Sequence, residues 1–512
     1  SGYRVFKAET VKAIEDVQWI PEWGEERIKN MVNMRSDWCI SRQRRWGVPI
    51  PILYCEDCGK VIVNDETIKA ISDMFRRESS DSWYSKDPSE FIPASVKCEC
   101  GCNKFRKEMD IFDVWFDSGC THAAVLQERP ELSWPADLYL EGCDQYRGWF
   151  QSSLLTSVAT TGRAPYKAVC THGWVVDGKG EVMHKSKGNV VLPEEVISKY
   201  GADVLRLWVA SLDFHNDVRV SPEMLKQLSE AYRKIRNTAR FILGNLGNGD
   251  GFNPDTDMVA LDKLSDFDKW ALSRLDSVIE KVKASYEAFD FYLAYHAIHS
   301  FCVVDMSNFY LDIVKDTLYC SAEKSEERRA VQTTMYIILD SLVRLVAPIL
   351  TFTSDEIWKY MPHKSTDDLR GVPFNQMPEK TGVEISAEFE AKWNKIHAVR
   401  DDVLKALEEK RTAGVIGKSL DAGVTICAEG ADFEQLSGYP ELAQAFSVSY
   451  VNVKNGADGE FKGAVEGVSV TVEKAAGEMC ERCWSHAPSV GSDAQYPHLC
   501  ARCAAVMKLD LG

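Results

Sequence analysis

The chain has 512 residues, a formal net charge of −17 and an apolar content of 45%. Roughly three or four domains with buried cores are possible at this length and composition, which excludes wholesale disorder. No run of eighteen apolar residues is present, so the sequence predicts no membrane span. Residues 1–10 show neither an apolar signal core nor an initiator methionine. We therefore expect a cytoplasmic protein, and a piece of a longer chain.

Two short segments are basic in this acidic chain, and only a local basic patch could bind nucleic acid here. One is "RQRRWG" at 42–47, and the other is "YRKIRNTAR" at 232–240. In the second, Arg233, Arg236 and Arg240 recur at helical spacing and would share one face. Both segments could equally be solvated surface, which is the commoner outcome for an isolated run of charge.

The first of two cysteine groups lies between residues 55 and 102. Cys55 and Cys58 form one C-x2-C pair, and Cys98, Cys100 and Cys102 offer three thiols for the second pair. In a cytosolic chain such pairs favour metal over disulfides. Cys100 precedes a glycine, as knuckle cysteines often do, so we expect Cys98 and Cys100 as ligands of zinc, although spacing does not decide among the three.

Short apolar runs alternate with helical stretches from about 105 to 212. We predict strands over 110–116, 136–142 and 167–176, and helices over 146–162, 192–200 and 202–212. This alternation predicts a parallel sheet with helical crossovers, in which ligands bind beyond the carboxyl ends of the strands. The polar residues at those ends are site candidates: Asp117, Glu141, Asp144 and His172.

The stretch "DGKGEVMHKSKGNVV" at 177–191 concentrates lysine and glycine. Glycines let a loop move, and lysine ammonium groups meet phosphate as point charges. A mobile loop that presents lysine to a polyphosphate is one interpretation. A solvated surface turn is the other, and this stretch alone favours it.

Residues 221–411 read as a helical bundle of long amphipathic stretches, one of them limited by Pro348. "TSDEIW" predicts a capping box, with Thr353 three residues before Glu356. We expect the aromatic residues of these stretches to be core, among them Trp270, Tyr286 and Phe309.

A small α/β unit follows, with strands expected over 422–429, 447–453 and 467–475. The second cysteine group then reads C-x2-C, sixteen residues, C-x2-C, and its thiols are those of Cys480, Cys483, Cys500 and Cys503. Four thiolates complete a tetrahedral zinc shell and leave no open position, so we predict a structural site. The alternative is a pair of redox-active motifs, which no surrounding strand–helix pattern supports.

Several motifs together resemble one family. They are "SDWCISRQRRWGVPIP" at 36–51, "DVWFDSG" at 113–119, "YLEGCDQYRGWF" at 139–150, "THGWVVDGKGEVMHKSKGN" at 171–189, "GADVLRLWVAS" at 201–211, "RKIRNTARFILGNL" at 233–246 and "CERCW" at 480–484. The chain thus resembles the bacterial isoleucyl-tRNA synthetases, which are class I aminoacyl-tRNA synthetases. "RQRRWGVPIP" and "CERCW" separate it from the valine and leucine relatives, and the resemblance covers essentially the whole chain.

The resemblance implies an α/β plus all-α chain that corresponds to the C-terminal half of such an enzyme. The implied parts are the return from the editing insertion into the catalytic domain (1–48), a zinc-binding insertion (49–112), the second half of the Rossmann-like nucleotide-binding domain (113–220), a helical anticodon-binding bundle (221–410), a small α/β junction (411–475) and a C-terminal zinc knuckle (476–512).

In the family a K-M-S-K-S loop closes over ATP, and it aligns here with residues 182–186. The resemblance makes Lys185 the catalytic lysine, and Met183 and Ser186 residues of the ATP site. Val182 and His184 depart from the pattern; Lys187 could compensate in part for the first lysine.

The resemblance also assigns the strand-end residues. Glu141 would bind the aminoacyl-adenylate, with Asp144 and Gln145 beside it. Trp115 and Trp149 would wall the isoleucine side-chain pocket, and His172 and Gly173 would lie near adenine. The alternative for Trp115 and Trp149 is that they are aromatic residues of the core. The alternative for His172 and Gly173 is that they form an ordinary strand end. Arg233, Arg236 and Arg240 are the candidate tRNA contacts, because their helical spacing predicts one basic face.

The family's H-I-G-H motif is absent, since no H-x-G-H occurs among the ten histidines. The editing insertion is absent too, and residues 1–35 would be its return strand. We therefore predict part of an isoleucine–tRNA ligase that is inactive by itself, with tRNA(Ile), isoleucine, ATP with magnesium, and zinc as partners, no membrane contact and a monomeric state. The alternatives are a stand-alone tRNA-binding module or half of a split synthetase, and a thiol redox or zinc-storage protein.

Overall fold

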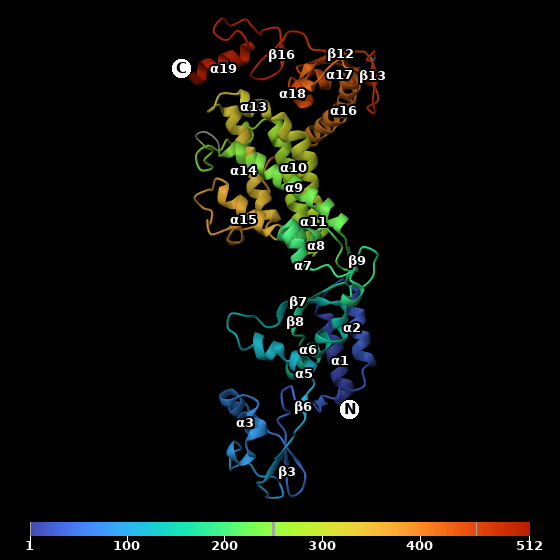
Figure 1. The fold of residues 1–512 in the computed structure, drawn as a ribbon, viewed down its shortest axis with the longest axis vertical. Coiled ribbons are helices and arrows are strands. Elements are labelled where there is room, and N and C mark those ends of the chain that lie inside the picture. The colour runs from blue at the N-terminus through green and yellow to red at the C-terminus, as the bar shows by residue number, and fades with distance from the viewer. Residues whose placement is uncertain (1, 248–250, 457, 512) are drawn as a thin grey trace. The chain divides into compact units, whose positions relative to one another are not determined.

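Three parallel strands form the sheet that the alternating pattern predicts, in the order β1–β8–β7. Figure 1 labels the paired strands β7 and β8 of this sheet. The strands are β1 (Gln18–Ile20), β7 (Ala136–Gly142) and β8 (Tyr166–His172). The helix α6 (Trp149–Thr161) connects β7 to β8, and it ends at Gly162, whose φ of 73° a glycine adopts without strain. The expected helical crossover between parallel strands is therefore present.

The computed structural model describes residues 2–247, 251–456 and 458–511. They form two units, the first made of residues 1–175 and 214–218 and the second of residues 176–213 and 219–512. Among the described helices, none has both the length and the apolar content needed to span a membrane.

The sheet of the first unit is packed by helices α1 (Gly2–Glu15), α2 (Trp23–Met34) and α6. Ile14, Ile28 and Leu154 are fully buried there, against Tyr166 and Val169 of the central strand. Residues 2–34 thus contain two helices with the three-residue strand β1 between them, rather than the return strand alone that the sequence predicted for residues 1–35.

The predicted zinc-binding insertion has a core of its own, built on Leu53, Ile71, Met74 and Trp83. Its elements are β3 (Leu53–Cys55), β4 (Val61–Ile62), α3 (Asp65–Glu78), α4 (Ser82–Ser85) and β5 (Phe105–Lys107). The sheet order is β4–β3–β5, and both pairs are antiparallel. The insertion begins and ends beside a second antiparallel pair, β2 (Ser41–Arg42) and β6 (Ile111–Phe112).

One sequence-predicted strand is wrong. Of residues 110–116, only β6 is extended, and α5 (Val114–Gly119) follows. Asp113 ends the strand because its Oδ1 accepts the N–H of Trp115 at 3.2 Å and so caps the new helix. Asp117 therefore lies within a helix rather than after a strand, and burial raises the pKa of its carboxyl group.

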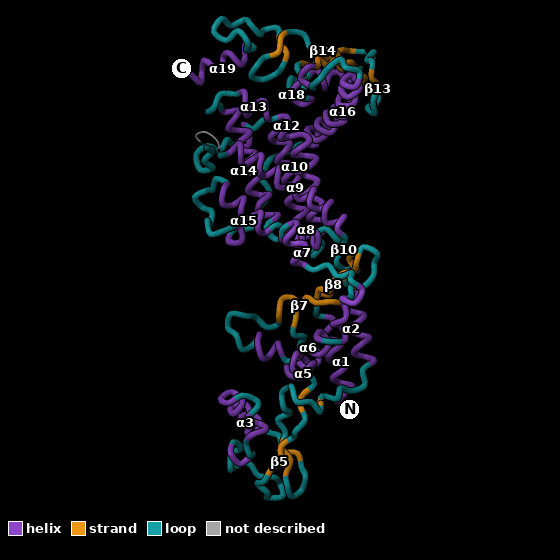
Figure 2. The backbone as a smooth tube through the Cα atoms, in the orientation of Figure 1, coloured by secondary structure: helices purple, strands orange, loops and turns teal. Residues whose placement is uncertain are grey.

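Helices dominate the second unit from α7 to α16 (Figure 2). They are α7 (Pro193–Tyr200), α8 (Ala202–Ala210), α9 (Pro222–Leu246), α10 (Asp266–Glu287), α11 (Phe291–Ser300), α12 (Leu311–Ile313), α13 (Lys315–Cys320), α14 (Glu326–Val346), α15 (Thr351–Tyr360) and α16 (Ala387–Thr412). Trp270 and Phe309 are buried in the bundle, as predicted, and Tyr286 donates its hydroxyl to Leu345 O at 2.7 Å.

The predicted capping box at Thr353 is also wrong. Helix α15 begins two residues earlier, at Thr351, and no side chain of its own N-cap residue binds its first turn. The carboxylate of Asp203 on α8 takes that place, accepting the N–H groups of Phe352 at 3.3 Å and Thr353 at 2.7 Å. The Thr353 hydroxyl instead lies 2.9 Å from that of Tyr232.

The small α/β unit continues the core of the helical bundle, since one cluster of buried residues runs from Leu207 to Val472. Its sheet order is β12–β11–β14–β13, built from β11 (Ala422–Ala428), β12 (Tyr450–Asn455), β13 (Phe461–Lys462) and β14 (Val468–Lys474), with α17 (Gly430–Ser437) and α18 (Leu442–Phe446). The remaining elements are β9 (Val175–Asp177), β10 (Val218–Val220), β15 (Glu478–Met479), β16 (His486–Ala487) and α19 (Ala501–Leu511).

Candidate functional site

Two of the predicted residues, Glu141 and His172, lie at the carboxyl ends of β7 and β8. The register pairs Glu141 with Thr171 and Gly142 with His172, and the side chains of Glu141 and His172 are exposed. A Cβ atom at Gly142 would lie 2.7 Å from Asp144 Oδ1 and 3.6 Å from His172 Cε1. Asp144 and His172 therefore approach each other over a residue that has no side chain.

Gln145 connects the strand end to helix α6. Its Oε1 accepts the N–H of Trp149 at 3.0 Å, and its Nε2 donates to Asp144 Oδ2 at 3.2 Å. Asp144 and Gln145 lie on the 3₁₀ turn Cys143–Arg147 that directly follows β7. This turn orients both polar side chains at the edge where a parallel sheet binds ligands.

The two predicted pocket tryptophans lie on neighbouring helices. Trp149 stacks on Tyr139 with ring centroids 4.1 Å apart, and its Nε1 donates to Ser118 O at 3.0 Å. Trp115 is 42% exposed, and a Cβ atom at Gly148 would lie 3.0 Å from its ring. Trp149 is therefore partly buried in the core, whereas Trp115 leaves an apolar face exposed to solvent.

Gly173 cannot be replaced without displacing the backbone beside it. A Cβ atom there would lie 2.4 Å from the carbonyl of Asn216, and the Gly173 N–H donates to Phe214 O at 2.9 Å. The close approach of this second segment explains why a glycine follows His172 at the end of β8.

The lysine loop, residues 177–191, belongs to the second unit. The side chains of Asp177 and Asn189 hold its base. The Asp177 carboxylate accepts the N–H groups of Lys179 and Glu181, each at 2.9 Å, and the amide of Asn189 at 2.9 Å. Asn189 Oδ1 accepts the N–H of His184 at 2.9 Å. The bond from Asn189, together with those from the backbone, lowers the pKa of Asp177.

The segment that the base supports is exposed. Lys185, Ser186 and Lys187 form a single 3₁₀ turn with no buried residue, and Gly188 closes it at φ 67°. Lys187 pairs with Glu181 at 3.2 Å, while Met183 Sδ accepts the N–H of Val191 at 3.3 Å. The loop can therefore present the Lys185 ammonium group to a ligand without first breaking a buried contact.

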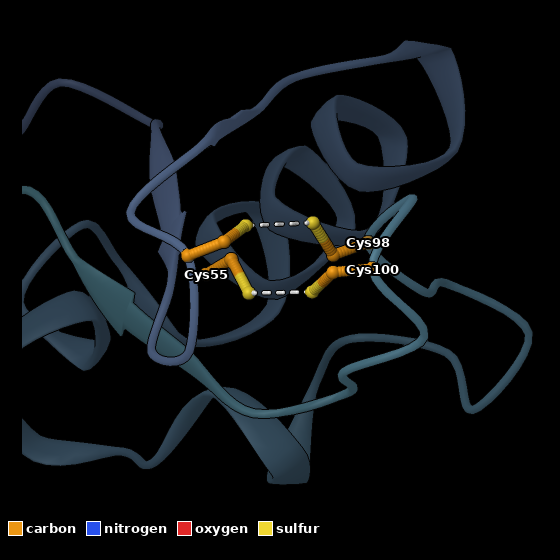
Figure 3. A group of neighbouring side chains, drawn as sticks. Cys55, Cys98 and Cys100 are labelled. Atoms are coloured by element: carbon orange, nitrogen blue, oxygen red, sulfur yellow. Dashed lines mark hydrogen bonds between the residues drawn. The ribbon is translucent and has the colours of Figure 1, made fainter.

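The first cysteine group consists of the four residues that the sequence analysis favoured. The Sγ atoms of Cys55, Cys58, Cys98 and Cys100 all lie within 4.8 Å of one another. Figure 3 shows the side chains of Cys55, Cys98 and Cys100 in this group. The Cys58–Cys98 and Cys55–Cys100 sulfur separations are 3.4 Å and 3.6 Å. Thiolates about 2.3 Å from a tetrahedral zinc would lie about 3.8 Å apart, so the group fits that ion.

The fifth thiol of this region points elsewhere. Cys102 Sγ accepts the N–H of Lys104 at 3.3 Å, and its carbonyl accepts the N–H of Cys98 at 2.8 Å. The Cys58 N–H is the largest of the effects that lower the pKa of Cys55 to about 6, so one thiol of the group is already disposed to ionise.

The second group is formed by Cys480, Cys483, Cys500 and Cys503, and all four belong to one cluster of sulfur atoms. Cys480 Sγ accepts the N–H of Cys500 at 3.3 Å, and the Cys483 and Cys500 sulfurs are 3.9 Å apart. Burial opposes ionisation of Cys480, but backbone N–H groups outweigh it and lower the pKa to about 7. Buried Cys320 of α13 packs against this group.

The three arginines of α9 differ in their surroundings. Arg233 pairs with Glu230 at 2.6 Å, and Arg236 pairs with Glu356 at 3.3 Å. Arg240 is exposed and lines a shallow hollow of about 410 Å³. The single basic face of the sequence analysis is therefore partly neutralised by carboxylates.

Sequence reasoning missed the carboxylates that hold these features in place. Asp113 is 6% exposed and accepts Arg42 Nη2 at 2.7 Å and Trp38 Nε1 at 3.0 Å. Asp177 and Asn189 brace the lysine loop, and Asp203 caps α15. Only Asp177 had a local signal, because Asp followed by glycines is typical of a turn in which the side chain binds the backbone.

Three family models match the chain. They are tRNA synthetases class I (I, L, M and V) over residues 3–221, the anticodon-binding domain of tRNA ligase over 268–426, and a zinc finger found in FPG and IleRS over 477–506. The isoleucine–tRNA ligase of Caldanaerobacter subterraneus subsp. tengcongensis is 53% identical over 98% of this chain. The chain belongs to the isoleucine–tRNA ligase family. The isoleucine–tRNA ligases of Syntrophotalea carbinolica and Geobacter sulfurreducens are 52% and 50% identical over 96% and 97% of it.

The chain spans about half the length of these relatives, 54% of the first and 53% of the other two. A class I synthetase part, a helical bundle and a C-terminal zinc finger therefore follow one another in this family member, as the sequence predicted.

Proposed function

We propose that the chain is part of an isoleucine–tRNA ligase, which activates isoleucine with ATP to an aminoacyl-adenylate and transfers it to tRNA(Ile). One observation carries this proposal: relatives of that name are 50–53% identical over 96–98% of the chain. The free thiols and the absence of a membrane-spanning helix among the described residues support a cytoplasmic protein, which we propose is a monomer.

In this proposal the end of β7 and β8 holds the adenylate. Glu141 can accept hydrogen bonds from ribose hydroxyls or from the ammonium group of isoleucine. Asp144 and Gln145 flank it on the following turn, and His172 and Gly173 lie at the adenine side. The exposed face of Trp115 and the outer edge of Trp149 wall the isoleucine side chain.

Lys185 is the catalytic residue of the proposed activation step. When the isoleucine carboxylate attacks the α-phosphorus of magnesium-bound ATP, negative charge accumulates on the phosphates and pyrophosphate leaves. A preorganised ammonium group stabilises that charge more than it stabilises the ground state. Met183 and Ser186 would support the nucleotide on either side, while Val182 and His184 stand where the family pattern has lysine and serine.

The two cysteine groups would hold zinc as structural ions. Four thiolates fill the tetrahedral shell, so neither zinc could activate a water molecule or bind substrate. The binding free energy would instead stabilise the fold of the two short segments that carry the thiols.

Pyrophosphate exchange tests the activation proposal. We propose that the 512 residues alone give no isoleucine-dependent exchange of pyrophosphate into ATP, since they contain no H-x-G-H sequence. Addition of the N-terminal part of a relative that carries this motif should restore exchange, and a Lys185→Ala chain should not support it. Exchange by the pure chain would refute the first statement, and full activity of the Lys185→Ala chain would refute the second.

The alternative function is a tRNA-binding module that works by itself or as half of a split synthetase. The match of residues 268–426 to an anticodon-binding domain favours it. In either case we propose that the arginines of α9 contact tRNA phosphates, which predicts binding that weakens steeply with salt. Arg240→Glu should reduce tRNA affinity more than Arg233→Glu, because Arg233 is already paired with Glu230. Equal and negligible effects of both substitutions would remove this face from the proposal.

A further inference from the structure

Residues 43–47 form a loop with an unusually exposed aromatic side chain. Trp46 is 95% exposed, and the side chains of Arg44 and Arg45 beside it are exposed as well. Within the part of the chain that the structure describes, neither guanidinium group forms a hydrogen bond or an ion pair. An indole ring left entirely in water is costly for a folded protein, and large exposed apolar groups next to polar ones mark binding sites.

The loop is rigidly anchored at its base. Arg42 Nη2 is 2.7 Å from buried Asp113, and Gln43 Nε2 donates to Asp110 Oδ2 at 2.8 Å. Val48 on the far side accepts the N–H of Phe112 at 2.8 Å. In the motif "RQRRWG", Arg42 and Gln43 thus anchor the loop. The side chains of Arg44, Arg45 and Trp46 are the ones that the loop presents to solvent.

The far end of the loop is held by close packing as well as by hydrogen bonds. A Cβ atom at Gly47 would lie 2.5 Å from Ile111 Cδ1, so the backbone lies directly on the strand β6. The backbone conformation at Gly47, with φ 153°, also favours glycine there. Exposure of Trp46 is therefore imposed by the fold and is not the result of a loose terminus or an unfastened loop.

The chemistry of the three presenting side chains selects an anion with an aromatic group. Two adjacent arginines in a chain of net charge −17 form a local positive site, and guanidinium groups bind phosphate through paired N–H donors. A tryptophan face stacks on an unpaired base whatever its identity. An apolar protein partner fits less well, because Trp46 has arginine and glycine rather than apolar residues as its chain neighbours.

We propose that Arg44, Arg45 and Trp46 bind an unpaired nucleotide of an RNA chain, with Trp46 stacked on the base and the two guanidinium groups on the flanking phosphates. This inference rests on the proposed function, since it names how the first unit would contact the tRNA substrate. It assigns single-stranded rather than duplex RNA, because paired bases are not free to stack on a side chain.

The test measures fluorescence anisotropy of labelled RNA with the zinc-loaded 512-residue chain at several salt concentrations. The probes are a tRNA(Ile) transcript, the same transcript without its unpaired 3′ nucleotides, and a short single-stranded RNA. Trp46→Ala should weaken binding of the single strand and of the intact transcript by about tenfold, whereas Trp46→Phe should retain most of the affinity. The double variant R44Q/R45Q should lower the slope of log affinity against log salt by about 1.4.

The matched control is R76Q/R77Q, which removes the same charge from two adjacent exposed arginines of α3 in the same unit. It should leave both affinity and salt slope close to those of the parent chain. Because the loop side chains are exposed, all of these variants should unfold at the parent temperature.

The outcomes separate the inference from the proposed function. If the parent chain binds tRNA and the Trp46 and Arg44/Arg45 variants bind it equally well, the inference is overturned and the proposed function stands. An equal loss in the R76Q/R77Q control would also overturn it. If the parent chain binds none of the probes, the tRNA-binding part of the proposed function fails with it.

Discussion

Asp177 and Asn189 join the two ends of the lysine loop through a 2.9 Å hydrogen bond from Asn189 Nδ2 to the Asp177 carboxylate. The same Asn189 side chain accepts the N–H of His184, the residue just before Lys185. One asparagine thus fixes both the base of the loop and the start of the turn that carries the lysine. These hydrogen bonds hold the backbone next to Lys185 to the base of the loop.

Asn189→Ala should loosen the loop without unfolding the rest of the chain. It removes these two hydrogen bonds and the one from Asn189 Nδ2 to Val182 O at 3.3 Å. Each is worth about 1 kcal/mol net, so amide hydrogen exchange of residues 179–189 should accelerate at least about tenfold. Exchange measured by mass spectrometry on loop peptides checks this. Asn237→Ala, at an exposed position of α9, is the control and should change nothing in the loop. Unaltered exchange in the Asn189 variant would show that the brace is unimportant.

The cysteine geometry predicts which thiols hold metal. Cys100→Ser should lower the zinc content from about two ions per chain to about one, and Cys480→Ser should do the same, because each leaves three thiolates in a four-ligand shell. Cys102→Ser should keep both ions, since its sulfur faces the backbone of Lys104. Metal analysis after gel filtration distinguishes these variants. Loss of an ion from the Cys102 variant would mean that the ligand assignment is incorrect.

The capping role of Asp203 predicts a stability defect. Asp203 is 6% exposed, and Asp203→Ala would leave the N–H groups of Phe352 and Thr353 without an acceptor, at a cost of about 1–3 kcal/mol. The midpoint of urea unfolding, followed by far-UV circular dichroism, should fall accordingly. Asp355→Ala, on the exposed side of the same helix, should stay within about 0.5 kcal/mol of the parent. A midpoint equal to that of the control would contradict the capping role.

A buried histidine predicts how stability depends on pH. Burial among Trp270, Phe309 and Trp393 is the main reason that the pKa of His397 falls to about 4. The nearby Arg400 contributes to this decrease and Asp401 opposes it. Between about pH 6.5 and pH 4 the unfolded chain binds a proton that the folded chain does not. The free energy of unfolding therefore decreases as the pH falls through this window.

Phenylalanine at this position removes the titration and keeps an aromatic ring. The parent should lose about 2 kcal/mol more stability than His397→Phe between pH 7 and pH 5. Urea unfolding at the two pH values measures the difference, and the exposed His296→Phe is the control. Equal losses in the parent and the His397 variant would mean that the ring is protonated in the folded chain as well.

Much of the architecture was predictable because its signals are local. The closely spaced cysteine pairs set the two cysteine groups, glycine at 162 and 201 ended helices, and the apolar run at 136–142 became β7. The strand predicted over 167–176 is β8 only as far as His172, and β9 begins at Val175. Two local signals failed for one reason. In each case a carboxylate accepts N–H groups of the first helical turn, Asp113 at α5 and Asp203 at α15. The spacing of apolar residues does not predict these hydrogen bonds.

The sequence by itself determined the order of the parts, the thiol pairs and the lysine-rich loop, because these depend on residue type and on spacing along a short stretch. Only the tertiary structure decided that Cys102 is turned away, that Arg233 and Arg236 are paired, and that Arg42 anchors while Trp46 is presented. The physical reason is that a partner up to 150 residues away in sequence, such as Asp203 for Thr353, determines whether a polar group is satisfied or left to bind a ligand.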